Sequence, residues 1–266
     1  MRARAVEPDL TLSGSRSSVV ASRLARVPTF VLCDYEYTEL SLYRRMGAYL
    51  VHPRYIPTAA FEARGWNRER LIAFDGLKEH LTFADYQASN SEPLELRIDD
   101  PNVRKVLLRP PAEESHYYTS ATRSLTLAVL ELLANRTDWQ CIVAPRHDWQ
   151  IDDLRRLTWR HEPVVLKGGV PFAQLLASVD LVVCGGGTML REAAYLGLPA
   201  CSLFQSRLGA VDAYLAREGR VVLASAAGDL VGLLDDPRKR EPLPSQPDLP
   251  AQLVAQLVDR AKRRLT

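Results

Sequence analysis

The sequence predicts an α/β protein built from two doubly wound domains with parallel sheets. Short apolar runs that suit buried strands alternate with stretches of helical periodicity, the order expected of β/α units. A polar segment with prolines, 88–102, interrupts the alternation and indicates a linker. Three consecutive glycines also follow one strand directly before a helix. These observations predict domains at 1–87 and 103–248, and a C-terminal amphipathic helix over 249–266.

The two halves are unequal in their expected strands. Before the linker we predict four, at 10–13, 29–33, 49–51 and 71–74, with helical patterns ending at residue 24 and spanning 39–46, and a loop at 75–79. After the linker we predict six, at 103–108, 139–144, 163–166, 181–184, 200–204 and 220–223, with helices at 120–134, 151–157, 171–178, after the glycines, at 209–217 and at 249–265. Because the first half begins almost at once with a strand, we expect it to lack its opening β/α units.

Composition excludes several classes of protein. The formal net charge of +2 gives no reason to expect a nucleic-acid partner. The cysteines are scattered among apolar runs, so buried thiols are expected in a reducing compartment, and no metal spacing occurs. No apolar run approaches the ~18 residues that span a bilayer, and the first residues lack the apolar core of a signal peptide. We expect a cytoplasmic protein; a basic cluster at 260–264 either touches anionic lipid or simply suits the end of a helix.

The glycine turn is the most informative motif. The buried strand 181–184 leads into Gly185, Gly186 and Gly187, and Thr188 then opens a helix. The amides and positive dipole end of that helix favour a bound anion such as a diphosphate. Glu192 lies about one turn further on, where its carboxylate can accept hydrogen bonds from sugar hydroxyls. The alternative is that the glycines only allow close packing of helix and sheet.

Residues 185–199 resemble the nucleotide-binding segment of GT-B glycosyltransferases and UDP-N-acetylglucosamine 2-epimerases. In those families the glycine turn meets the diphosphate or sugar and the glutamate holds the ribose. The chain as a whole is similar to the domain-of-unknown-function family 354, a GT-B-like group of uncharacterised bacterial and archaeal proteins. The motifs that carry this likeness, in order, are Ser15-Arg16-Ser17, Asp34-Tyr35-Glu36, Gly76-Leu77-Lys78-Glu79, Arg109-Pro110-Pro111 and 185–199.

The resemblance implies a GT-B-like fold in which two Rossmann-type domains face a cleft, the N-terminal one truncated, since the family's first motif has no counterpart here. It implies a metal-independent glycosyltransferase of surface polysaccharide or glycolipid assembly. The implied substrate is a nucleotide sugar, UDP-linked, with a saccharide or lipid-linked acceptor and no tightly bound cofactor. Two alternatives stay open: an enzyme like the UDP-N-acetylglucosamine 2-epimerases, and a catalytically silent domain that binds nucleotide or a partner.

Candidate ligands of the nucleotide follow strands of the second domain. Arg109 ends its first strand and is expected to bind phosphate from the carboxyl edge of the sheet, unless it pairs with Glu113. Arg146 and His147 follow the neighbouring strand and are expected beside the uracil or the phosphates, although loops at this edge also carry residues without function.

Candidates in the first domain are less specific. Asp34 and Glu36 end a strand, where a carboxylate could act as general base, or they cap the next helix. The remaining substrate-binding candidates are Ser15, Arg16, Ser17, Lys78 and Glu79. For the two serines we favour helix capping; for Lys78 and Glu79 a solvated pair in a loop is the alternative.

Overall fold

A computed structural model describes residues 8–86, 94–96, 98, 100–115 and 118–265. Most of the expected linker 88–102, namely 88–93, 97 and 99, lies outside these residues. The chain divides into two compact units. The first comprises Met1–Asp85, Gly209–Val211 and Ser245–Thr266, and the second comprises Tyr86–Leu208 and Asp212–Pro244.

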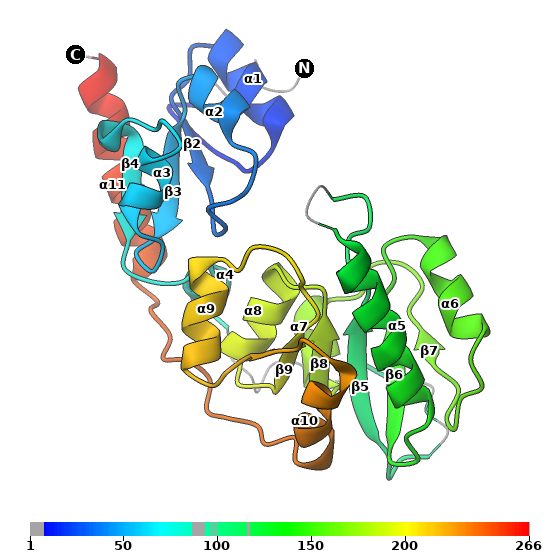
Figure 1. The fold of residues 1–266 in the computed structure, drawn as a ribbon. Helices are drawn as coiled ribbons and strands as arrows, with labels where there is room; N and C mark the ends of the chain where they lie inside the picture. Colours follow the sequence, from blue (N-terminus) through cyan, green and yellow to red (C-terminus); the bar gives the residue numbers. More distant parts are fainter. Residues whose placement is uncertain (1–7, 87–93, 97, 99, 116–117, 266) are drawn as a thin grey trace. The chain divides into compact units, whose positions relative to one another are not determined.

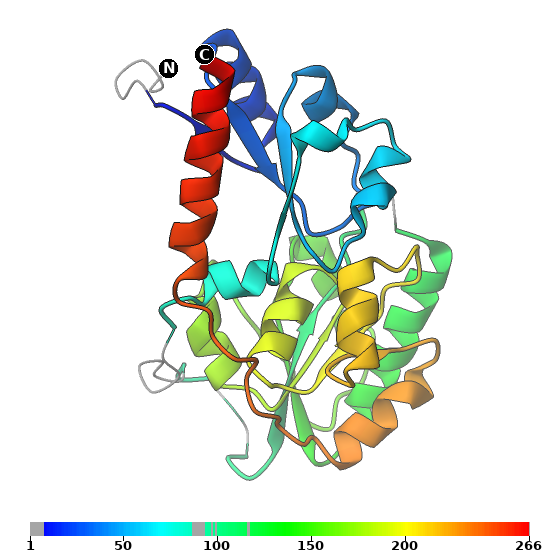
Figure 2. The ribbon, with the colours of Figure 1, turned by 90° about the vertical axis from the view of Figure 1, so that its left-hand side faces the viewer.

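The first unit is a parallel sheet of four strands in chain order, β1-β2-β3-β4. Right-handed crossovers in such a sheet place the connecting helices on one face, and α11 covers the other (Figures 1 and 2). The elements are β1 (Thr11–Leu12), α1 (Arg16–Leu24), β2 (Thr29–Leu32), α2 (Ser41–Arg45), β3 (Tyr49–Pro53), α3 (Thr58–Glu62), a 3-10 turn (Arg68–Arg70), β4 (Leu71–Phe74), α4 (Lys78–Thr82) and α11 (Leu249–Leu265).

Alternation along the strands explains how α11 docks. Phe30, Val51 and Phe74 project from successive strands to one face of the sheet, where they pack against Leu253 and Leu257. Those two leucines are four residues apart and so lie on the same face of the helix. Burying this stripe is what ties the C-terminal helix to the first sheet.

The second unit is a parallel sheet of six strands in the order β10-β9-β8-β5-β6-β7. Chain order therefore runs outward from β5 to β7 and then from β8 to β10, the doubly wound arrangement predicted from the sequence. Its elements are β5 (Arg104–Arg109), α5 (Ser120–Ala134), β6 (Trp139–Val143), a 3-10 turn (Asp148–Ile151), α6 (Asp152–Arg155), β7 (Val164–Val165), α7 (Phe172–Ala177), β8 (Leu181–Cys184), α8 (Thr188–Tyr195), β9 (Ala200–Ser202), α9 (Ala210–Arg217, whose first two residues belong to the first unit), β10 (Val222–Leu223), a 3-10 turn (Ala227–Leu230) and α10 (Val231–Asp235).

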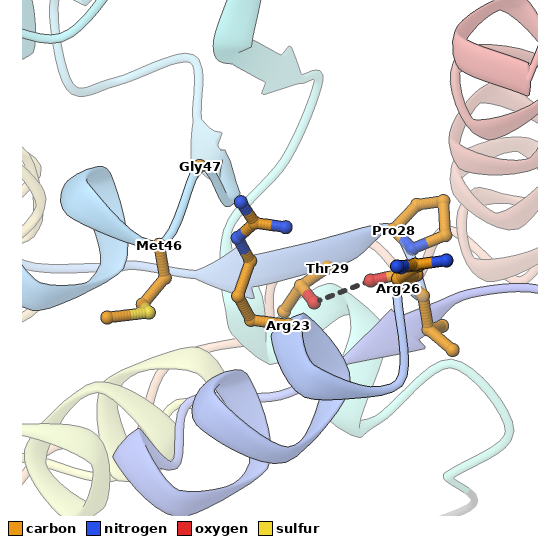
Figure 3. Close-up of a pocket in the computed structure, with 7 residues that line it drawn as sticks. Arg23, Arg26, Pro28, Thr29, Met46 and Gly47 are labelled. Atoms are coloured by element: carbon orange, nitrogen blue, oxygen red, sulfur yellow. Dashed lines mark hydrogen bonds between the residues drawn. The ribbon is translucent and has the colours of Figure 1, made fainter.

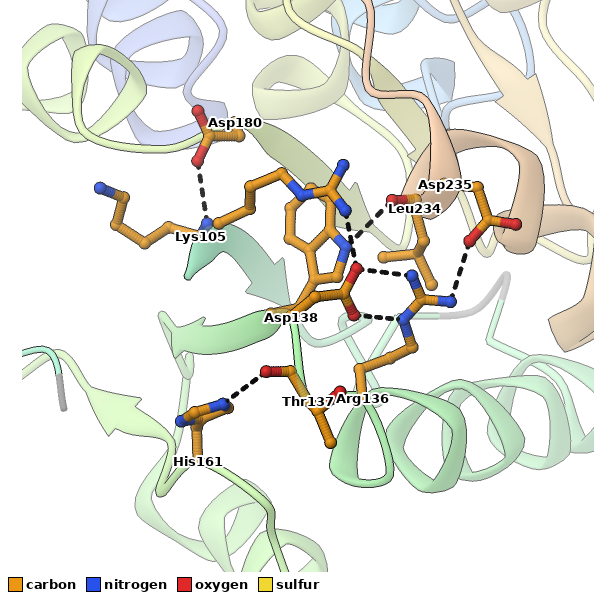
Figure 4. A network of polar contacts seen from close by, with 10 residues as sticks. Lys105, Arg136, Thr137, Asp138, His161, Asp180, Leu234 and Asp235 are labelled. Carbon is orange, nitrogen blue, oxygen red and sulfur yellow. Dashed lines mark hydrogen bonds and ion pairs between the residues drawn. The ribbon is translucent and has the colours of Figure 1, made fainter. Parts of the chain in front are cut away.

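The amino edge of this second sheet is closed by paired charges (Figure 4). Asp138 accepts hydrogen bonds from both Arg104 and Arg136, and Arg136 also pairs with Asp235 at 3.0 Å. The indole of Trp139 donates to the carbonyl of Leu234 at 3.0 Å, which anchors α10 to the start of β6. The network fixes loops at the end of the sheet opposite to the strands' carboxyl ends.

Two sequence predictions about helices are wrong. Residues 75–79 were expected to form a loop, whereas Lys78 is the first residue of α4. Ser15 stands at the N-cap of α1, yet its side chain makes no capping bond; its hydroxyl lies 2.8 Å from that of Ser17 instead.

The expected burial of the cysteines is confirmed. All four are free thiols inside the cores of the two units: Cys33, Cys141, Cys184 and Cys201. Burial raises the pKa of the last three to about 12. Within the described ranges, no helix is both long and apolar enough to cross a membrane.

Candidate functional site

The second sheet has a switch point between β5 and β8. At this position the strand order changes direction, and ligands of open α/β sheets bind outside the carboxyl ends of the two strands that flank it. Arg109 on β5 is paired in register with Cys184, the last residue of β8. The arginine predicted to bind phosphate therefore lies beside the glycine turn, although 75 residues separate the two in sequence.

Each glycine of the turn has its own structural reason. A Cβ on Gly185 would lie 2.7 Å from the backbone Cα of Pro111, a contact too close for any side chain. Gly186 and Gly187 have φ values of +88° and +87°, in the left-handed region that glycine adopts without strain. Gly187 is the N-cap of α8 and has no side chain to bond the amides of the first helical turn.

A hollow of about 460 Å³ opens at this switch point. It is bounded by the ends of β5 and β6, the loop after β7, α7, the glycine turn and the first turns of α8. The lining residues are Arg109, Ala144, Pro145, Arg146, Leu166, Gly168, Gly169, Val170, Phe172, Leu175, Gly186, Thr188, Met189 and Glu192. Its volume falls within the range of about 300–1,000 Å³ that small-molecule sites occupy.

Two arginines make the hollow positive. The half-buried Arg109 donates through Nη1 to the carbonyl oxygens of Ala144 and Pro145, at 2.7 and 2.9 Å, which holds its guanidinium at the sheet edge. Burial, and next the charge of Arg146, lower the pKa of Arg109. Two guanidinium groups that repel each other beside a helix N-terminus favour an anion between them.

The alternative partner for Arg109 is ruled out within the described residues. Glu113 lies 3.7 Å from Arg123, which also forms a two-pronged pair with Asp153 at 2.8 and 3.0 Å. The ion pair between Arg109 and Glu113 that the sequence left open is therefore absent, and Arg109 keeps its place on the wall of the hollow.

Glu192 lies one turn into α8, at the helical position expected from the sequence, and its side chain lines the hollow. Its neighbour Arg191 is buried and forms a bidentate ion pair with Asp212, at 2.6 and 3.1 Å. This pair, which was not predicted from the sequence, anchors α8 through a residue next to Glu192. Nothing in the sequence marks the two residues as partners.

Two predicted ligands of the nucleotide are not on the wall of the hollow. Gly185 shapes the turn but is covered by Pro111. His147 is not among the lining residues; its ring stacks on Trp149 at a centroid distance of 5.4 Å, and its Nε2 lies 3.8 Å from Glu114.

The first unit gathers titratable groups at the carboxyl edge of its sheet. Asp34, after β2, pairs with Lys78 at the start of α4, with 2.5 Å between Oδ2 and Nζ. Lys78 and Glu79 are thus not a solvated pair: Lys78 holds Asp34, and Glu79 is fully buried beside His80. His52, near the end of β3, is also fully buried, and burial lowers its pKa.

Glu36 is buried rather than positioned as a cap of the helix that follows it. Its Oε1 accepts a 2.9 Å hydrogen bond from the amide of Ala210, a residue of the same unit. The cap-like contact before α2 comes from Glu39, whose carboxylate accepts from the amide of Ser41 at 2.8 Å. Hydrogen bonding from the Ser41 side chain, and next from its amide, lowers the pKa of Glu39.

The remaining first-unit candidates are exposed. Ser15, Arg16 and Ser17 follow β1 and begin α1, at the carboxyl edge of the sheet. Among the residues that the structure describes, no group of three histidine, cysteine, aspartate or glutamate side chains is arranged to hold a metal ion.

Comparisons with known proteins agree with this fold. One curated relative, the uncharacterized protein MJ0665 of Methanocaldococcus jannaschii, is 25% identical over 241 residues, which cover 87% of this chain and 67% of that protein. The solved structures include UDP-GlcNAc 2-epimerase from Neisseria meningitidis bound to UDP-GlcNAc, with a TM-score of 0.66 at 14% identity over 97% of this chain and 78% of that one. The M. jannaschii UDP-GlcNAc 2-epimerase in complex with UDP-GlcNAc and UDP gives a TM-score of 0.66 at 12% identity, over 97% and 77% of the two chains.

These likenesses confirm the predicted GT-B-like architecture of two Rossmann-type units. A family model described as "Protein of unknown function (DUF354)" matches residues 8–262. The chain therefore belongs to the DUF354 family.

Proposed function

We propose that this protein is an enzyme that acts on a nucleoside-diphosphate sugar, held in the hollow at the switch point of the second unit. The observation that carries the proposal is the convergence of Arg109, Arg146 and the N-terminus of α8 on one hollow. Among the lining residues the one carboxylate is Glu192, which stands a helical turn away from the glycines. The positive end of the hollow matches the phosphates of a nucleoside diphosphate, and the carboxylate of Glu192 matches the hydroxyl groups of its ribose.

Each part of the hollow has a role in this proposal. The two arginines and the backbone of Gly186, Gly187 and Thr188 bind the diphosphate, while Glu192 accepts hydrogen bonds from the ribose. The apolar side chains on the wall pack against the base; they are Leu166, Val170, Phe172 and Met189. The proposed nucleoside is uridine, because two proteins of similar fold have been solved in complex with UDP-GlcNAc, one of them also with UDP.

Two reactions fit such a site. In glycosyl transfer to a saccharide or lipid-linked acceptor, negative charge develops on the departing diphosphate, where Arg109, Arg146 and the helix N-terminus would stabilise it. Epimerisation at a sugar carbon needs groups that remove and return a proton. The buried carboxyl and imidazole groups of the first unit favour this second reaction. The similarity in fold to a UDP-GlcNAc 2-epimerase also favours it.

Residues of the first unit supply the chemical step in this proposal. Asp34 and Glu36 are the candidate acid/base groups, and Lys78 forms an ion pair with Asp34 at 2.5 Å. Ser15, Arg16, Ser17 and Glu79 are proposed to help bind the sugar or acceptor.

The test follows UDP-GlcNAc by NMR with the full chain, alone and with saccharide or lipid-linked acceptors. Formation of the manno isomer supports epimerisation, and release of UDP only with an acceptor supports transfer. Binding without turnover would leave a nucleotide-binding protein and overturn the enzymatic proposal. Failure to bind either UDP or UDP-GlcNAc would overturn the site itself.

Variants separate binding from chemistry in the same assay. Glu36→Gln is expected to abolish turnover while UDP affinity stays unchanged. Glu39→Gln removes an exposed carboxylate nearby in sequence and serves as the matched control. Equal activity of both variants would exclude Glu36 from the reaction.

A further inference from the structure

The amino edge of the first unit's sheet contains a hollow walled by arginines (Figure 3). It has a volume of about 250 Å³ and lies where α1 and α2 end and β2 and β3 begin. Arg23 and Arg26 contribute its charge, and Met46 and Gly47 form part of its wall. It is at the opposite end of the strands from Asp34 and Lys78, so it is separate from the groups proposed for the chemical step.

A second hollow, of about 340 Å³, lies on the same edge. Arg70, before β4, lines it together with Arg260 and Arg263 of α11. Arg70 also donates to the carbonyl of Gly47, which lines the first hollow, so the two are neighbours. We call the five arginines of both hollows the basic edge: Arg23, Arg26, Arg70, Arg260 and Arg263.

The two hollows of the basic edge are lined by more arginines than carboxylates. Glu69 is the one carboxylate among the residues that line the two hollows. Among the described side chains, no carboxylate forms an ion pair with Arg23 or Arg26. The amino edge of the second sheet is different, because there Asp138 and Asp235 neutralise the arginines. A cluster of this kind attracts polyanions.

Apolar side chains stand among these charges. Leu24, between Arg23 and Arg26, is 81% exposed. Val20 lies four residues earlier, on the same face of α1, and is 36% exposed. An exposed leucine next to arginines combines the apolar and basic contacts through which interfacial segments bind a bilayer.

Arg26 has an unusual backbone. It follows the end of α1 with a φ of +59°. The amide of Val27 donates to the carbonyl of Ser22, and the amide of Arg26 donates to the carbonyl of Arg23. This is the Schellman ending, in which glycine is the favoured residue at the left-handed position. The chain thus has an arginine where glycine would be more stable.

We propose that the basic edge, with Leu24 and Val20, is a docking surface for a bilayer that contains anionic phospholipids. The arginines bind lipid phosphates, and Leu24 inserts below the head groups. A nucleic acid fits less well, because single strands stack on exposed aromatic rings, whereas Tyr49 of the second hollow is buried and stacked on Phe30 at 4.9 Å.

The test is flotation of the full chain with vesicles of phosphatidylglycerol mixed into phosphatidylcholine, and with vesicles of phosphatidylcholine alone. Binding is expected only to the anionic vesicles. Leu24→Ser is expected to lower the partition coefficient about tenfold, and Arg26→Gly about fivefold. Arg155→Gln, which removes an exposed charge from α6, is the matched control and should bind like the wild type.

Arg26→Gly also separates docking from folding. Because glycine suits the left-handed position, the variant is expected to raise Tm by about 2 °C while it weakens vesicle binding. Absence of wild-type binding to anionic vesicles would overturn the proposal, as would binding that ignores both Leu24→Ser and Arg26→Gly. Tighter binding to a single-stranded RNA that depends on Arg26 but not on Leu24 would overturn it in favour of a nucleic acid.

Discussion

Arg146→Gln tests the electrostatic argument for the hollow through two quantities: the stability of the free protein and its affinity for UDP. Arg146 is exposed on the wall of the hollow and forms no ion pair with a described residue. After burial, its charge is the second cause that lowers the pKa of Arg109, which means that the two guanidinium groups repel each other. Removing it should leave the free protein as stable as the wild type or slightly more stable, and should weaken the binding of UDP.

The size of the effect follows from one lost charge-assisted hydrogen bond. Such a bond contributes about 1.5–3 kcal/mol, equivalent to roughly a 10- to 150-fold change in affinity. At a free UDP concentration of 100 times the Kd of the wild type, the ligand adds about 2.7 kcal/mol to the stability of the wild type. A variant that binds about 30-fold more weakly gains about 0.9 kcal/mol at the same concentration. At about 2–4 °C per kcal/mol, the Tm increases are roughly 5–11 °C and 2–4 °C.

Thermal unfolding with and without UDP measures both quantities, and calorimetric titration gives Kd directly. Arg155→Gln removes an exposed charge on α6 that does not line the hollow, and serves as the control. An equal UDP-dependent increase in Tm for Arg146→Gln and the wild type would refute the reasoning. A large loss of stability in the free variant would equally refute it, since the arginine would then have a structural role.

Two further predictions concern the fold around the sites. Gly185→Ala places a Cβ 2.7 Å from backbone and should cost about 1–3 kcal/mol of stability, whereas Gly169→Ala, with nothing within 4 Å, should be nearly neutral in urea unfolding; equal effects would contradict the packing account. Burial lowers the pKa of His52 below 6.5, so the unfolded chain takes up the proton at a higher pH than the folded chain does. The stability that the neutral His52 contributes is therefore complete above about pH 6.5 and is lost as the pH falls below that value, by up to about 1.4 kcal/mol per pH unit. Unfolding at pH 7.5 and 5.5 should show a smaller loss for His52→Gln than for the wild type or for the exposed-site control His147→Gln, and identical losses would exclude His52 as the cause.

Sequence periodicity was sufficient to predict the regular parts of the fold. The strand at 181–184 and the helices at 120–134 and 249–265 have the predicted bounds, because each is long or apolar enough to show its period. The five-residue α4 was missed, since so short a helix shows less than two turns of pattern. The solvated alternative for Glu79 stayed open for the same reason, because the burial of this side chain comes from packing within the unit, which no local pattern shows.

The candidate site also combines features that are local in sequence with features that depend on strand pairing. The glycine turn and Glu192 were predicted because their spacing is local to one strand and helix. The neighbourhood of Arg109 was not, because Glu113 is closer in sequence than the carbonyls of Ala144 and Pro145 that bind the guanidinium. Only strand pairing shows which side chains meet at the switch point.

A crystal structure of the full chain with UDP tests the central claim most directly. The account predicts the diphosphate at the start of α8, within hydrogen-bond distance of the backbone amides of Gly187 or Thr188 and of Arg109, with the ribose at Glu192. UDP bound elsewhere on the protein, or a hollow that stays empty at saturating UDP, would contradict it.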